Sequence, residues 1–261
     1  MSSNSNIIAL TMGDPSGVGT EIAIRAKIKK IKKPDFFIIH DIDFVKKILK
    51  KMKSKLKVRE ISSPSEVKKL PKNYLAVLPI KISKNTQLGK KNLSNVKSIL
   101  TSIDLAVKLA KNGEVAAIVT NPINKDVIGK KVKNFKGHTE YLAKKDRTND
   151  QLMMMMNKNL KTIPLTTHIA INKVSNKINK KNIIKAVINA NVSLRKDFKI
   201  KKPRIAVTAL NPHAGDGGLI GDDEKVKILP AIKYCKKKKI SVEGPLPADS
   251  AFIKNNQNKY D

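Results

Sequence analysis

The sequence predicts an α/β fold with a mostly parallel sheet, and two observations support this prediction. Short apolar runs alternate with stretches of helical periodicity along the chain, and turns rich in glycine or proline follow several of the apolar runs. Strand–helix–strand order of this kind is typical of parallel strands that are joined by right-handed crossovers.

The first half of the chain shows this alternation most clearly. We expect strands at residues 7–12, 36–40, 74–78 and 114–119. We expect helices at residues 17–28, 42–52 and 93–110. The last of these helices is the clearest, because its apolar side chains recur at spacings of three and four and Gly113 follows it as a stop signal. The strand at residues 114–119 is expected to be buried.

The second half repeats the pattern. Its expected strands are residues 152–156, 162–168 and 204–210, and its expected helices are residues 182–194 and 222–237. Three acidic residues open the last helix, where they suit its positive end. Pro230 is expected to kink that helix, because proline cannot complete the helical hydrogen bond.

Composition limits the class of protein. A chain of 261 residues with 40% hydrophobic residues is long enough to bury a substantial core in one large or two modest domains. The single cysteine, Cys235, excludes an internal disulfide and a cysteine-based zinc site, and it suggests a reducing, cytoplasmic compartment. The polar N-terminus lacks the features of a signal peptide, and no apolar run has membrane-spanning length, so we expect no membrane partner.

The charge balance is extreme, with a formal net charge of +33. Such a charge alone suggests a polyanionic partner such as nucleic acid. However, the basic residues are mostly lysines that are spread along the whole chain, and only 4% of the residues are aromatic. Arginine is the usual reader of bases and aromatic rings are the usual stacking platforms, so a lysine-coated, solvated surface is favoured over nucleic-acid binding.

Glycines follow the first expected strand, at the edge of a parallel sheet where functional residues collect. The residues of this loop that are candidates for a phosphate- or cofactor-binding turn are Gly13, Asp14, Gly17 and Gly19. The loop matches neither the dinucleotide-binding fingerprint nor the P-loop pattern. A plain strand-to-helix turn is therefore an equally good interpretation.

Two further loops carry polar candidates. Asn121 and Lys125 follow the strand at residues 114–119, and Lys125 is placed to meet a phosphate or carboxylate. His138 and Thr139 follow Gly137 where a loop enters a helix, and their side chains can donate hydrogen bonds to a substrate. Lysine is so common in this chain that Lys125 alone is weak evidence.

Histidines end two of the later strands. His168 closes residues 162–168, and His213 lies in the proline- and glycine-rich loop after residues 204–210. Neutral imidazoles are good ligands for divalent metals, so this pair predicts metal binding, with a satisfied structural role as the alternative for each. His40 also ends a strand, and there the structural role is favoured.

Six segments in this order resemble the 4-hydroxythreonine-4-phosphate dehydrogenase family of vitamin B6 biosynthesis. The resemblance runs from Ile8 to the end of the chain. The segments that carry it are GDPSGVGTE at 13–21, TNPINK at 120–125, GHTEYLA at 137–143, TTH at 166–168, NPHAGDGG at 211–218 and GPLPAD at 244–249.

The resemblance implies a two-domain α/β fold like that of isocitrate and isopropylmalate dehydrogenases, with domains at residues 1–128 and 129–261. It implies oxidation of a small phosphorylated hydroxy-amino acid with NAD or NADP, a divalent metal (Zn, Mg or Co), and a homodimer with a shared active site. His138 and Thr139 match the family's substrate contacts, and His168 and His213 match two of its three metal ligands.

The resemblance also implies that the family's C-terminal part is missing here. The third metal histidine and the segment that completes the first domain are expected beyond Asp261, so the chain is interpreted as a fragment or a truncated product. The alternatives are a sister dehydrogenase of phosphorylated threonate or erythronate, and an inactive remnant. Nucleic-acid binding leaves the six segments unexplained.

Overall fold

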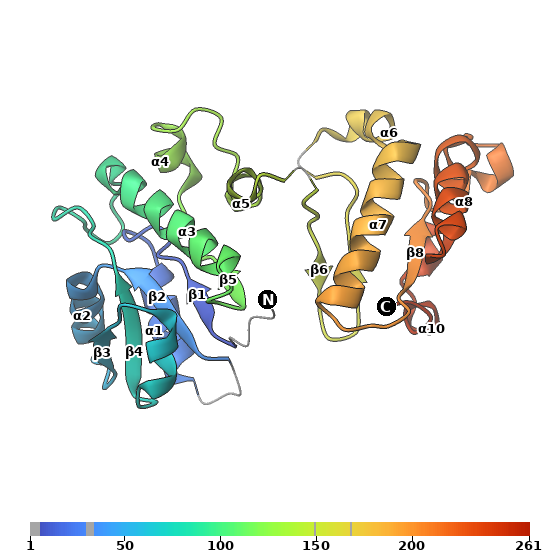
Figure 1. Ribbon diagram of the computed structural model, residues 1–261. Coiled ribbons are helices and arrows are strands. Elements are labelled where there is room, and N and C mark those ends of the chain that lie inside the picture. The colour runs from blue at the N-terminus through green and yellow to red at the C-terminus, as the bar shows by residue number, and fades with distance from the viewer. Residues whose placement is uncertain (1–5, 30–33, 149, 168) are drawn as a thin grey trace. The chain divides into compact units, whose positions relative to one another are not determined.

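The structure is a computed structural model that describes residues 6–29, 34–148, 150–167 and 169–261 (Figure 1). The chain forms two compact units, one ending at Asn149 and the other running from Asp150 to Asp261. This division lies later in the chain than the expected boundary at residues 128/129. The helix at His138–Asp146 packs within the first unit, where the Tyr141 hydroxyl donates a 2.9 Å hydrogen bond to Asp104.

The first unit is built on a five-stranded sheet of order β3-β4-β2-β1-β5 (Figure 1). Every pairing in it is parallel, as the alternating pattern predicts. The strands are β1 (Ile8–Leu10), β2 (Phe36–His40), β3 (Lys57–Glu60), β4 (Tyr74–Pro79) and β5 (Ala117–Val119). The main helices are α1 (Gly19–Ile28), α2 (Ile42–Lys51), α3 (Val96–Lys111), α4 (Lys125–Gly129) and α5 (His138–Asp146), with 3-10 turns η1 (Pro64–Lys69) and η2 (Leu93–Asn95).

Both faces of this sheet are buried at β2, whose successive side chains point to opposite faces and enter two different cores. Phe37 and Ile39 join the core under α3, whereas Phe36 and Ile38 join the core under α1 and α2. A strand that is covered on both faces needs a continuous apolar run, which β2 has.

Strand β5 differs from the prediction. It is three residues long, and it is exposed rather than buried, with Val119 46% exposed. Within the described residues β5 is the edge of the sheet and pairs only with β1.

The second unit packs helices on a small parallel sheet. Strand β8 (Arg204–Thr208) pairs with β9 (Ser241–Leu246), and β6 (Met155–Met156) forms an antiparallel pair with β7 (Lys161–Thr162). The helical elements are η3 (Ile171–Lys173), α6 (Val174–Lys177), α7 (Lys180–Lys196), η4 (Ala214–Gly218), the π-helical η5 (Glu224–Ile228), α8 (Leu229–Lys237), α9 (Ala248–Ala251) and α10 (Lys254–Gln257). The core lies between α7, α8 and the β8–β9 pair.

Three expectations for this unit need correction. The strands expected at residues 152–156 and 162–168 shrink to the two-residue strands β6 and β7. Pro164 follows β7 and cannot donate a ladder hydrogen bond, which accounts for the early end of that strand. The helix expected at 222–237 runs without a break from Asp223 to Lys237, but its first part is the π-helical turn η5, which leads directly into α8. Pro230 follows this turn, so the helix is distorted close to the position where a proline kink was expected.

No helix in the described ranges combines the length and the apolar character that a bilayer crossing requires. The second unit also contains a cavity of about 700 Å³. Residues 154–166, α7 and β8 together form most of its lining, and none of the predicted site residues in the described ranges lines it.

Candidate functional site

The glycine-rich loop after β1 is held against the loop after β5. The N–H of Asp14 donates to the Pro122 carbonyl at 2.8 Å. Gly13 has φ of +72°, and a Cβ there would lie 2.6 Å from the Pro122 carbonyl oxygen. Only glycine fits so close an approach in this conformation. The carboxyl ends of β1 and β5 are adjacent in the sheet, which brings these two predicted loops together.

Asn121 joins the carboxyl ends of β1 and β5 through a buried hydrogen bond. Its side-chain Nδ2 donates to the Thr11 carbonyl at 3.0 Å, and both residues are buried. A Cβ on Gly19 would lie 3.1 Å from the Cβ of Asn121, so Gly19 also serves this contact. These packing roles favour the strand-to-helix turn as the reason for the glycines.

Asp14 uses its carboxylate within the loop, where Oδ1 accepts from the N–H of Ser16 at 2.9 Å, and the N–H of Gly17 donates to its carbonyl at 2.9 Å. The Ser16 hydroxyl is buried and has no hydrogen-bond partner among the described residues. Sequence reasoning did not single out Ser16.

His40 has a structural role, as the sequence favours. Its Nδ1 accepts from the N–H of Asp41 at 2.7 Å, so its Nε2 carries the proton toward the Thr20 hydroxyl, 2.9 Å away. Burial lowers the pKa of His40 from 6.5 to about 4, although the nearby Asp41 carboxylate acts to raise it. The imidazole is therefore neutral, and it connects the end of β2 to the first turn of α1.

Lys125 and His138 lie near each other at the start of α5. Lys125 opens α4, and its Cε and Nζ both lie 3.3 Å from the position that a Cβ on Gly137 would occupy. Burial lowers the pKa of His138, and the positive charge of Lys125 lowers it further. The Nε2 atom of His138 is buried without a hydrogen-bond partner among the described residues. Thr139, the next residue, is exposed.

His213 lies in the second unit, on a tightly wound loop. Ala214, Gly215, Asp216 and Gly217 all have positive φ values, between 45° and 70°. The His213 side chain is exposed, and its Nε2 lies 3.5 Å from Oδ2 of Asp249, which belongs to the GPLPAD segment. Sequence reasoning did not propose Asp249 as a partner of His213, although both residues lie in segments that carry the family resemblance.

A buried glutamate braces this loop. Glu224 is 5% exposed, and its Oε1 accepts from the N–H groups of Leu210 and Asn211 at 3.0 and 3.5 Å. Its other oxygen, Oε2, is buried with no partner among the described residues. The sequence assigned Glu224 only to the positive end of a helix, so its role at the end of β8 was missed.

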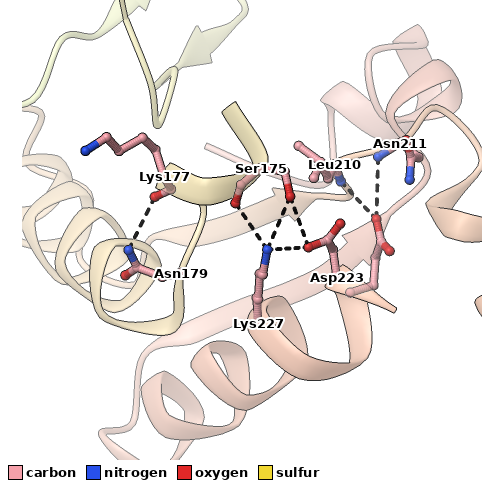
Figure 2. A network of polar contacts seen from close by, with 8 residues as sticks. Ser175, Lys177, Asn179, Leu210, Asn211, Asp223 and Lys227 are labelled. Atoms are coloured by element: carbon pink, nitrogen blue, oxygen red, sulfur yellow. Dashed lines mark hydrogen bonds and ion pairs between the residues drawn. The ribbon is translucent and has the colours of Figure 1, made fainter. Parts of the chain in front are cut away.

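A second set of contacts ties the π-helical turn η5, which begins at Glu224, to α6, as Figure 2 shows. Lys227 forms an ion pair with Asp223 and donates to the carbonyl of Ser175 at 3.1 Å. The π-helical turn η5 is thus tied both to the end of β8 and to α6.

The described residues do not complete a metal site. Within residues 6–29, 34–148, 150–167 and 169–261, no group of three His, Cys, Asp or Glu side chains is placed to hold an ion. His213 and Asp249 supply one imidazole and one carboxylate, which are suitable donor types but only two in number. His168, the other predicted ligand, lies outside the described residues.

Sequence comparison assigns the family. The sequence model of "Pyridoxal phosphate biosynthetic protein PdxA" matches residues 32–261. The chain belongs to the PdxA family. A PdxA relative from Pseudoalteromonas translucida, named 4-hydroxythreonine-4-phosphate dehydrogenase, is 32% identical over 97% of this chain and 75% of its own length. One of the same name from Sulfurihydrogenibium sp. is 34% identical over 94% of this chain and 75% of its own length.

Solved PdxA structures agree with the fold. A crystal structure of 4-hydroxythreonine-4-phosphate dehydrogenase from Klebsiella pneumoniae matches with a TM-score of 0.91 and 31% identity. The match covers 98% of this chain and 80% of that one. The predicted dehydrogenase-like α/β fold and the predicted family are confirmed.

Proposed function

We propose that this chain is a 4-hydroxythreonine-4-phosphate dehydrogenase of pyridoxal phosphate biosynthesis. The observation that carries the proposal is the family match over residues 32–261, together with the shared name of the relatives. The same name favours this substrate over the phosphorylated threonate or erythronate of a sister enzyme.

In the proposed reaction, the carbon that bears the secondary hydroxyl loses a hydride and the hydroxyl oxygen loses a proton. NAD or NADP, when bound, accepts the hydride. The product is a β-keto acid, which loses CO2 and takes up a proton to give 3-amino-2-oxopropyl phosphate.

The proposed roles of residues in the first unit rest on polar side chains that are exposed or lack a hydrogen-bond partner among the described residues. His138 and Thr139 are proposed to hold the substrate, supported by the buried, unpartnered Nε2 of His138 and the exposed position of Thr139. The loop at residues 13–19 is proposed to face the cofactor. Its support is the unpartnered Ser16 hydroxyl, beside the start of α1, which has no side-chain cap.

A divalent metal, Zn, Mg or Co, is part of the proposal, with His213 and His168 as ligands. Its support is the exposed His213 imidazole with a carboxylate 3.5 Å away. Because the described residues supply only two donors, no step of the reaction is assigned to the metal. A homodimer and a cytoplasmic location are proposed as well. Light scattering and cell fractionation would test them.

The test is an NAD(P)-reduction assay with 4-phosphohydroxythreonine and each of the three metals. The matched relatives are longer than this chain, so a second protein should carry the C-terminal remainder of the Pseudoalteromonas relative. Turnover by either protein, with less than a tenth of that rate on phosphorylated threonate and erythronate, supports the proposal. Preference for a sister substrate, or no turnover and no substrate binding by either protein, would overturn it.

A further inference from the structure

Lys125 reaches across from α4 to the first turn of α5. Its Cε and Nζ lie 3.3 Å from the position of a Cβ on Gly137, and Gly137 has φ of +151°. A side chain at residue 137 would therefore press on the end of Lys125. The lysine ammonium therefore lies beside Gly137, the residue that precedes His138.

Lys125 differs from several other lysines of this unit in its ion pairing. Other lysines of this unit pair with acids, such as Lys145 with Asp104 at 2.7 Å and Lys91 with Asp126 at 3.4 Å. Within the described part of the chain, by contrast, no carboxylate lies within ion-pair distance of Lys125.

His138, the residue after Gly137, carries a hydrogen-bonding atom that lacks a partner among the described residues. Its Nε2 is buried without a partner in the described ranges, whereas buried polar atoms are nearly always bonded in proteins. An anionic oxygen that bonds to Nε2–H would satisfy this atom and would also lie close to a positive charge.

We propose that Lys125 is a substrate-binding residue, and that Lys125 and Nε2 of His138 together receive an anionic group of the substrate. This inference rests on the proposed function, which supplies a substrate with two such groups, a phosphate and a carboxylate. Both present oxygen acceptors of the kind that a lysine ammonium and an imidazole N–H recognise.

The protonation of His138 gives a readout that does not depend on turnover. Lys125 from α4 and Glu140 from α5 itself are charged groups at the first turn of α5, and Oε2 of Glu140 lies 3.7 Å from the Gly137 Cβ position. Burial and then Lys125 lower the His138 pKa. Removing the lysine charge should therefore raise that pKa, while the part due to burial remains.

The first experiment measures substrate affinity by calorimetry for the wild-type protein, Lys125→Gln and Lys130→Gln. Lys130 is an exposed lysine at the end of α4, so its replacement makes the same charge change away from His138. Loss of a charge-assisted hydrogen bond should weaken the binding of 4-phosphohydroxythreonine about 10- to 100-fold in Lys125→Gln. Lys130→Gln should stay within about twofold of the wild type.

Two substrate analogues identify the anionic group. 4-Hydroxythreonine lacks the phosphate, and 3-amino-2-hydroxypropyl phosphate lacks the carboxylate. The analogue that no longer distinguishes Lys125→Gln from the wild type lacks the group that Lys125 holds. NMR titration of the His138 ring should also give a higher pKa in Lys125→Gln than in Lys130→Gln.

The outcomes separate this inference from the proposed function. If the wild-type protein neither binds nor oxidises 4-phosphohydroxythreonine, the proposed function fails and this inference fails with it. If the wild type does both, but Lys125→Gln matches Lys130→Gln in affinity, only the role of Lys125 is refuted. An unchanged His138 pKa in Lys125→Gln would refute the proximity of the two side chains.

Discussion

Replacing Glu224 with alanine should destabilise the second unit by about 1–3 kcal/mol. The change removes the acceptor for two backbone N–H groups at the end of β8, those of Leu210 and Asn211, at 3.0 and 3.5 Å. A buried donor that is left without an acceptor costs about 1–3 kcal/mol. The shorter bond carries most of this cost, because 3.5 Å is at the limit of a hydrogen bond.

Glutamine at the same position is the matched variant. Glu224→Gln keeps an acceptor oxygen in nearly the same volume and removes a buried negative charge. One oxygen of that charge, Oε2, has no partner among the described residues. We therefore expect Glu224→Gln to lower the free energy of unfolding of the second unit by less than about 1 kcal/mol, because the negative charge that it removes is poorly compensated in the wild type.

The assay must be local, because a chain with two compact units need not unfold in one step. Backbone hydrogen exchange at Leu210 and Asn211 reports on this bond directly. A loss of about 1–3 kcal/mol corresponds to exchange about 5- to 160-fold faster in Glu224→Ala. Exchange within twofold of the wild-type rate would refute the stabilising role of Glu224. An equal loss of protection in Glu224→Ala and Glu224→Gln would show that the charge of Glu224, not its acceptor oxygen, stabilises this region.

Three further predictions concern the first unit. The His40 pKa of about 4 means that the unfolded chain takes up a proton near pH 6.5 and the folded one only near pH 4. About 3 kcal/mol of stability should thus be lost as pH falls through this window, and urea titrations of His40→Gln should lack this slope. Gly13→Ala should unfold at markedly lower urea, whereas Gly129→Ala, with nothing within 4 Å of its Cβ position, should not. Gly137→Ala should displace Lys125 and raise the His138 pKa in an NMR titration, and an unchanged pKa would contradict this.

The sequence predicted the first sheet well where burial leaves a local signature. The bounds of β2, Phe36–His40, match the prediction, because a strand covered on both faces must be apolar throughout. Strand β3 (Lys57–Glu60) was missed, because its polar sequence fits an edge position and carries no apolar pattern. Strand β5 is as apolar as a buried strand, and only its place at the edge of the sheet explains its exposure.

The candidate site was predictable to the extent that its residues lie in motifs. The loops at residues 13–19 and 120–125 were both singled out, and parallel pairing of β1 with β5 brings them together. The contacts of Glu224 and of Lys125 were not predictable, because each joins a helix start to a loop elsewhere in the chain. Strand β9 was also missed, since Gly244 and Pro245 argue against a strand unless it lies at an edge or bulge, as it does here.

The loop that carries His213 has a strained backbone, and this strain argues for a functional role. Ala214 has a φ of 57°, in the left-handed region that costs most residues with a Cβ about 1–2 kcal/mol, whereas Asp216, with a φ of 45°, belongs to a residue type that adopts this region more readily. Glu224 helps to offset this cost by holding the end of β8, at the expense of burying a carboxylate with one unpartnered oxygen. Glycine at residue 214 would adopt this conformation without that cost. The strain at Ala214 therefore favours the proposed role of His213, the residue that precedes it.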